Sequence, residues 1–231
     1  MSLIAQNLER VLERIAVATD AAGRRADEVQ LVGVTKYVDA EAARTLFEAG
    51  CHCLGESRPQ ELWQKAERLA TLPVQWHLIG HLQTNKVRRS LPHVHLIHSV
   101  DSVRLLSAVD KEAAVLSRTV HVLLEVNISG DANKHGFAPA EAESLIPELV
   151  NYPHLQVRGL MTMASLGADA ARAQADFAHL RELRDRWQSS CPEGVMLHEL
   201  STGMTGDFEQ AIQEGATMVR VGSALFEGLS S

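Results

Sequence analysis

The sequence is poor in cysteine and has no long apolar run. Its three cysteines, Cys51, Cys53 and Cys191, cannot all pair within one chain, so we expect free thiols and the reducing environment of the cytoplasm. No segment reaches the roughly 18 apolar residues of a membrane span, and residues 1–10 lack the apolar core of a signal peptide. We therefore expect no membrane association and no export.

An excess of basic charge is also missing. The 231 residues include 22 Lys and Arg against 29 Asp and Glu, which gives a net charge of −7. Nucleic-acid-binding domains show clustered basic residues, and the short run Lys86-Val87-Arg88-Arg89 is more typical of a solvated helix face. We therefore expect no nucleic-acid partner.

What the sequence does contain is a regular alternation of short apolar runs and helical patterns. Apolar residues at helical spacing, from Ile4 to Ile15, predict an amphipathic helix over residues 1–23. Eight strands are predicted after it, at Gln30–Lys36, His52–Glu56, Val74–Gly80, His95–Val100, Val120–Ile128, Leu155–Met163, Met196–Ser201 and Met218–Val221. A helix is predicted between each consecutive pair, beginning near Asp39, Arg58, Asn85, Ser102, Pro139, Ala170 and Thr205.

This alternation predicts one fold. Regular β-then-α order implies a parallel sheet with right-handed crossovers, and eight such units in 231 residues fit a closed (β/α)8 TIM barrel. An open doubly wound sheet is the alternative, but no G-x-G-x-x-G or P-loop pattern follows the first predicted strand. Because no low-complexity linker interrupts the chain, we expect a single α/β domain over residues 1–231, with the barrel at residues 30–223 behind an extra N-terminal helix.

Lys36 closes the first predicted strand, at the end of a barrel where catalytic groups collect. We expect its side chain to point at the barrel mouth and to be partly desolvated. A primary amine there is a nucleophile for aldehydes, and the product is a Schiff base. The alternative is a lysine that simply extends from the strand end into solvent.

The ends of the last two predicted strands are rich in glycine and hydroxyl groups. Ser201, Gly203 and Thr205 follow the seventh strand, and Gly222 and Ser223 follow the eighth. Barrels frequently bind phosphate between these two loops. Glycine and hydroxyl residues are common in turns and at helix N-caps such as Thr205, which accounts for each loop by itself. It accounts less well for the presence of such residues after both strands.

A lysine opposite a phosphate site suggests an aldehyde that carries a phosphate, and pyridoxal 5′-phosphate (PLP) is the commonest such cofactor. Arg220 stands just before Gly222 and would reach the pyridine nitrogen. A cation at that position opposes protonation of the nitrogen, so it weakens the ring as an electron sink.

Ordered strings along nearly the whole chain carry a family resemblance. They are residues 32–36, 54–57, 76–86, 126–129, 134–136, 158–163, 200–207 and 218–223. In these strings the chain resembles the pyridoxal phosphate homeostasis protein family (the YggS/PROSC-like proteins), which shares its barrel with the N-terminal domain of alanine racemase. The resemblance implies the barrel of type III PLP proteins.

The resemblance also implies the residues that hold the cofactor. Lys36 would form the Schiff base and Arg220 would meet the pyridine nitrogen. The other cofactor contacts would come from Ser57, His77, Met161, Ser201, Gly203, Met204, Gly222 and Ser223. Ser57 stands where the family often has Asn, which puts one side-chain amide contact in question.

Members of this family are associated with buffering and supplying PLP, which is intracellular vitamin B6 homeostasis, without efficient catalysis. We therefore expect a cytoplasmic monomer whose partners are PLP and, transiently, PLP-dependent apoenzymes. The alternative is a small PLP-dependent amino-acid racemase, which needs an acid or base on both cofactor faces. Tyr37 and Tyr152 are the only tyrosines, and because the sequence ends eight residues after Ser223 we expect no further domain of the kind that completes a racemase site.

A metal-dependent hydrolase is the alternative from another class. His93 and His95 have the spacing of two ligands on one strand face, but they lie at the start of a strand, away from the catalytic end. The Cys51-His52-Cys53 run lacks a distant second pair of ligands. We therefore expect no metal site.

Overall fold

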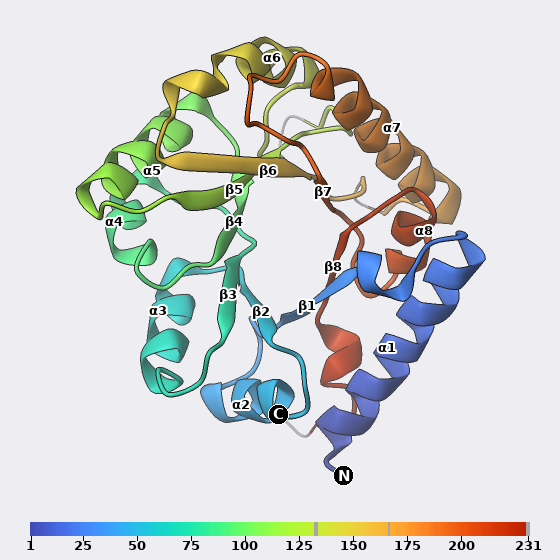
Figure 1. Ribbon diagram of the computed structural model, residues 1–231. Helices are drawn as coiled ribbons and strands as arrows, with labels where there is room; N and C mark the ends of the chain where they lie inside the picture. The colour runs from blue at the N-terminus through green and yellow to red at the C-terminus, as the bar shows by residue number, and fades with distance from the viewer. Residues whose placement is uncertain (132–133, 166, 230–231) are drawn as a thin grey trace.

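Eight parallel strands close into a barrel in chain order in the computed structural model, which describes residues 1–131, 134–165 and 167–229 (Figure 1). The strands are β1 Gln30–Val34, β2 Cys53–Glu56, β3 Gln75–Leu78, β4 Leu96–Val100, β5 Val120–Glu125, β6 Leu155–Met161, β7 Glu199–Ser201 and β8 Met218–Val221. Pairing of β1 with β8, in which Gln30 faces Met218, completes the ring. The predicted (β/α)8 barrel is confirmed and the open sheet is excluded. The single-domain boundaries of 1–231 stay a prediction, and residues 132–133, 166 and 230–231 lie outside the described residues.

Helices surround the barrel. They are α1 Leu3–Ala21, α2 Ala40–Glu48, α3 Pro59–Arg68, α4 Val87–Ser90, α5 Val103–Val115, α6 Pro139–Leu145, α7 Ala170–Gln188 and α8 Phe208–Gln213, with short 3-10 turns η1 Ala26–Glu28, η2 Thr84–Lys86, η3 Ile146–Asn151 and η4 Ser223–Leu225. Asp39 and Ser102 start α2 and α5 because their side chains accept hydrogen bonds from backbone N–H groups in the first turn. None of the described helices is both long enough and apolar enough to cross a membrane.

Several predicted strands and one predicted helix have different ends in the structure. β1 stops at Val34 instead of Lys36, and β5 stops at Glu125 instead of Ile128. Strand pairing ends where the chain turns out of the barrel, and the apolar pattern alone does not show that point. The last helix begins at Phe208 and not at Thr205, because Asp207 accepts from the backbone N–H of Met204 and closes a turn before the helix.

The extra helix α1 covers the outside of the barrel beside α8 (Figure 1). Its buried face includes Leu8 and Val11. The Arg14 guanidinium lies 4.6 Å from the ring centroid of Phe208. The Asn7 amide donates to the backbone carbonyl of Leu225 at 3.2 Å, so α1 is tied to the chain beyond β8.

Candidate functional site

A pocket of about 890 Å³ opens where the strands end and the βα loops begin. This is the end on which barrels of this kind carry their active sites. Six of the ten residues predicted to hold a cofactor line it: Lys36, Ser57, Met204, Arg220, Gly222 and Ser223. The other four, His77, Met161, Ser201 and Gly203, are not part of its wall.

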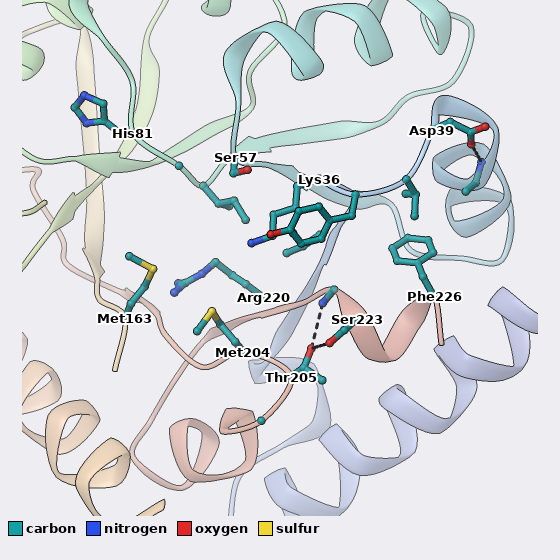
Figure 2. Close-up of a pocket in the computed structure, with 18 of the residues that line it drawn as sticks. Lys36, Asp39, Ser57, His81, Met163, Met204, Thr205, Arg220, Ser223 and Phe226 are labelled. Carbon is teal, nitrogen blue, oxygen red and sulfur yellow. Dashed lines mark hydrogen bonds between the residues drawn. The ribbon is translucent and has the colours of Figure 1, made fainter. Parts of the chain in front are cut away.

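Lys36 projects into this pocket from the loop after β1 (Figure 2). Its Nζ lies 4.9 Å from the ring centroid of Tyr37, and it makes no hydrogen bond or ion pair within the described residues. The expected partial desolvation is wrong, because β1 ends at Val34 and leaves Lys36 exposed in a turn. The amine is therefore accessible to a ligand.

A buried ion pair fixes the backbone just before Lys36. Glu56 Oε1 accepts from Lys65 Nζ at 2.5 Å and from Thr35 Oγ1 at 2.6 Å. The Lys65 ammonium also donates to the Thr35 carbonyl at 2.7 Å. Because both charged side chains are almost completely buried, this network holds β1, β2 and α3 in one arrangement beneath the turn that carries Lys36.

Arg220 is the buried cation of the pocket. Its Nη1 donates to Ser201 Oγ at 2.5 Å and its Nη2 donates to the Thr162 carbonyl at 2.9 Å. Burial lowers the pKa of the guanidinium to about 10, so it remains charged at neutral pH. Figure 2 shows Arg220 and Lys36 projecting into the same space.

The loops after β7 and β8 meet at one end of the pocket. Thr205 Oγ1 accepts from Ser223 Oγ at 3.2 Å and from the Gly222 N–H at 3.4 Å (Figure 2). The backbone N–H groups of Thr205 and Gly206 have no acceptor in the part of the chain that the structure describes. Free N–H and hydroxyl donors of this kind suit an anion such as phosphate.

Gly203 does not line the pocket and packs against α8, and its predicted contact with the cofactor stays a prediction. Its φ is +87°, and a Cβ there would lie 2.6 Å from the Ala211 Cβ and 2.9 Å from the Phe208 Cα. Glycine is therefore required for packing of the β7 loop against α8. Gly222, by contrast, does line the pocket.

Three predicted contact residues lie within the barrel. Met161 packs with Leu96, Leu123 and Met218 in a small buried cluster, and Met163 lines the pocket instead. His77 is buried against His98, and Ser201 contacts Arg220. The register of β6 and β3 turns Met161 and His77 away from the pocket wall, a fact that apolar patterning does not reveal.

The alanine racemase N-terminal domain model matches residues 7–230. The pyridoxal phosphate homeostasis protein of Aquifex aeolicus is 41% identical over 221 residues, which cover 96% of each chain. That of Pseudomonas aeruginosa is 40% identical and covers 98% of this chain and 96% of its own. The chain belongs to the pyridoxal phosphate homeostasis protein family.

Solved structures agree with this family membership. PipY of Synechococcus elongatus, in a structure with PLP bound, has a TM-score of 0.85 and 38% identity, and the match covers 96% of this chain and 99% of PipY. An alanine racemase of Clostridium difficile has a TM-score of 0.74 at 18% identity, which shows the shared fold alone. The match covers 98% of this chain but 57% of that racemase.

In this member of the homeostasis protein family, Glu125 is a pocket residue that the sequence reasoning missed. It lies at the end of β5 and is almost completely buried. Burial, together with the neighbouring charge of Asp101, raises the pKa of its carboxyl to about 7, although Arg220 and His81 oppose the shift. Glu125 lies inside the predicted strand Val120–Ile128, so the apolar pattern did not mark it as the residue at which the strand ends.

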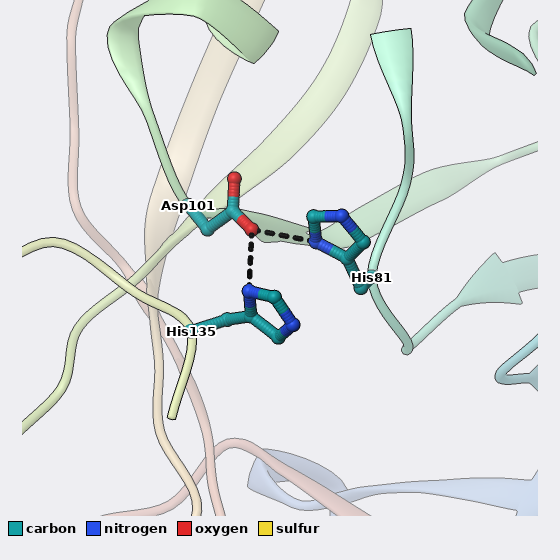
Figure 3. Close-up of side chains that lie close together, drawn as sticks. All are labelled: His81, Asp101 and His135. Carbon is teal, nitrogen blue, oxygen red and sulfur yellow. Dashed lines mark hydrogen bonds and ion pairs between the residues drawn. The ribbon is translucent and has the colours of Figure 1, made fainter. Parts of the chain in front are cut away.

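Two histidines and an aspartate gather at the edge of the pocket (Figure 3). His81 Nδ1 lies 2.7 Å from Asp101 Oδ2, and His135 Nδ1 lies 3.5 Å from the same oxygen. The two imidazole rings are stacked, with centroids 4.1 Å apart and planes 12° from parallel. A metal ion lies in the plane of each imidazole that binds it, so these near-parallel rings do not direct both lone pairs to one point. The arrangement is that of a stacked pair sharing one carboxylate, and the expected absence of a metal stays a prediction.

Proposed function

We propose that this chain binds PLP, holds it as a Schiff base on Lys36, and thereby buffers and supplies the cofactor in the cell. One observation carries the proposal: the amine of Lys36 and the guanidinium of Arg220 face one pocket whose end is closed by the Thr205–Ser223 contact. The PLP bound to the relative PipY supports the same ligand.

The donor set of the pocket fits the chemistry of PLP. Its aldehyde condenses with a primary amine, with loss of water, and its phosphate accepts hydrogen bonds. Lys36 supplies an amine that is free of protein partners within the described residues. The Thr205 hydroxyl, which accepts from Ser223, and the N–H groups of Thr205 and Gly206 are donors available for the phosphate, while Ser57 and Met204 line the wall.

Arg220 explains why holding the cofactor is favoured over catalysis. A guanidinium only donates hydrogen bonds and stays positively charged. Facing the ring nitrogen, it disfavours protonation of that atom, so the ring is a weak electron sink. The chain's own groups therefore bind and orient the ligand without preparing it for efficient carbanion chemistry.

A titration of the purified protein with PLP tests this proposal. We expect a saturable visible absorption band in the wild type and in Lys111→Ala, a control in which an exposed helix lysine is removed. The band should be absent in Lys36→Ala, because none of the other described residues that line the pocket carries an amine. An equal band in Lys36→Ala would contradict the proposal.

The second candidate, a small amino-acid racemase, has one observation in its favour. Inversion needs a second acid or base opposite Lys36, and Glu125 lines the pocket with its carboxyl pKa raised to about 7. Assays of the PLP-loaded protein with D- and L-alanine and serine distinguish the candidates. Turnover near about 10 per second, the median for enzymes, would favour the racemase.

We also propose that the protein acts as a cytoplasmic monomer and passes PLP to apoenzymes. Exposed apolar side chains surround the pocket, among them Tyr37, Met163, Met204 and Leu229, and such surfaces mark interaction sites. An apoenzyme mixed with the loaded protein should regain activity even when a phosphatase destroys free PLP. Complete suppression by the phosphatase would exclude direct transfer, and light scattering would measure the oligomeric state.

A further inference from the structure

A chain of hydrogen bonds crosses the interior of the barrel and ends at Arg220. His77 Nδ1 and His98 Nε2 lie 2.9 Å apart, and His98 Nδ1 and Ser201 Oγ lie 2.8 Å apart. Ser201 Oγ in turn accepts from Arg220. His98 is on β4 and Ser201 is on β7, which are not neighbours in the sheet, so this contact spans the barrel.

The direction of the chain follows from the donors available. Arginine can only donate, so Ser201 Oγ accepts from Arg220 and has its own proton left to give. The acceptor within reach in the described residues is His98 Nδ1. His98 then carries its proton on Nε2 and donates to His77 Nδ1. Every donor in the chain therefore points away from the pocket.

The far end of the chain is left unsatisfied. In this arrangement His77 carries its proton on Nε2, and this buried atom has no hydrogen-bond partner in the described structure. Burying a polar group without a partner costs stability, and barrel interiors are ordinarily filled with Val, Ile and Leu. Packing alone therefore does not account for two histidines at these positions.

The hydrogen-bonded side chains of His77, His98 and Ser201 are all uncharged, so they do not neutralise the positive charge of Arg220. Burial lowers the pKa of His77 to about 3 and that of His98 well below its usual value, and Arg220 lowers the pKa of His98 further. The Arg220 guanidinium donates to the Ser201 hydroxyl and the Thr162 carbonyl, and no carboxylate of the described residues is among its hydrogen-bond partners. These contacts use two of the five guanidinium N–H groups. The charge and the other donors remain available to the pocket.

We propose that His98, held by His77, is a positioning residue that acts through Ser201 to fix the Arg220 guanidinium toward the ring nitrogen of the bound ligand. This inference rests on the proposed function, because it is PLP that Arg220 would face. It assigns a role to residues that do not line the pocket. In a chain of hydrogen bonds each bond polarises the next, so removal of His98 weakens the hold on Arg220.

The test compares His98→Leu, which breaks the chain, with His98→Gln, whose amide again offers one acceptor and one donor. His95→Leu is the matched control, because this ring stacks on His77 at 5.7 Å but makes no hydrogen bond in the described residues. We expect PLP to dissociate roughly tenfold faster from His98→Leu, because the variant weakens the bond from the charged Arg220 to Ser201, and about tenfold is the lower end for loss of such a bond. His98→Gln and His95→Leu should release PLP at the wild-type rate.

A second readout separates positioning from simple packing. A nearby positive charge disfavours protonation of the ligand's nitrogens, so the pH at which the PLP band titrates should move upward in His98→Leu and stay unchanged in His95→Leu. In ligand-free protein, the Arg220 side-chain N–H signals in ¹⁵N NMR should exchange faster with water in His98→Leu. His98→Leu leaves the Ser201 hydroxyl and His77 Nδ1 without their partner and should lower the melting temperature, but a loss of stability alone does not move the titration of the PLP band.

Ser201→Ala gives an independent variant if His98→Leu does not fold. It should release PLP as fast as His98→Leu, and the double variant should be no faster than either, because both residues act through one chain. Wild-type behaviour of His98→Leu, additive effects in the double variant, or an equal defect in His95→Leu or His98→Gln would overturn the inference. If the wild type itself does not bind PLP, the proposed function fails, and the NMR exchange of Arg220 still decides the inference.

Discussion

Glu125→Gln removes an ionisable group from the pocket and keeps its shape. The Glu125 carboxyl is almost completely buried, and its pKa rises from the ordinary 4.5 to about 7, because burial and the charge of Asp101 penalise the ionised form. At about 1.4 kcal/mol per pH unit, this difference corresponds to about 3 kcal/mol. The folded protein binds this proton more tightly than the unfolded chain, so the contribution of Glu125 to stability is complete below pH 4.5 and is lost as the pH rises toward 7.

Urea unfolding of the ligand-free protein between pH 4 and about pH 8.5 measures this effect. Relative to Glu125→Gln, the wild type should lose about 3 kcal/mol of unfolding free energy across the window from 4.5 to 7. Glu13→Gln, on the exposed face of α1, is the control and should follow the wild type. Parallel curves for the wild type and Glu125→Gln would show that Glu125 ionises normally, and the electrostatic description of the pocket would be refuted.

Three further predictions concern stability. Because the folded protein holds His77 neutral with a pKa of about 3, its contribution to stability is complete above pH 6.5 and is lost as the pH falls; acid unfolding of wild type against His77→Gln measures it. Lys65→Met leaves the Glu56 carboxylate buried without its partner and should lower the unfolding free energy by about 3–5 kcal/mol in urea. Gly203→Ala places a Cβ against α8 at a positive φ and should lower it by about 1–3 kcal/mol.

Each of these predictions has a contradicting outcome. An unchanged acid transition in His77→Gln would mean that this ring is not held neutral by burial. Wild-type stability of Lys65→Met would show that the ion pair with Glu56 does not organise the turn before Lys36. If Gly203→Ala melts at the wild-type temperature, the loop after β7 does not pack against α8 as closely as described above.

The fold was predictable because its signals are local. Alternating apolar runs and helical patterns indicate eight β-then-α units, and caps such as Asp39 and Ser102 mark where helices begin. Strand ends were less predictable, because pairing register depends on neighbouring strands. Lys36 accordingly lies in a turn and not at the end of β1.

The site was predictable where a residue's position at a strand end decides its exposure to the pocket. Arg220 lies near the end of β8, and Lys36 and Ser223 lie just beyond β1 and β8, whereas Glu125 falls inside the predicted strand Val120–Ile128 and was missed. Contacts that form only when the barrel closes could not be predicted from the sequence. The bond between His98 and Ser201 joins residues 103 positions apart, and no local pattern predicts it.

The covalent attachment of PLP to Lys36 is the central claim, and trapping the adduct tests it most directly. The protein contains five lysines. Incubation with PLP, reduction with borohydride and peptide mass mapping identify the lysine that carries the cofactor. The account predicts a stoichiometric adduct on Lys36 and its loss in Lys36→Ala, whereas an adduct that maps to another lysine would contradict it.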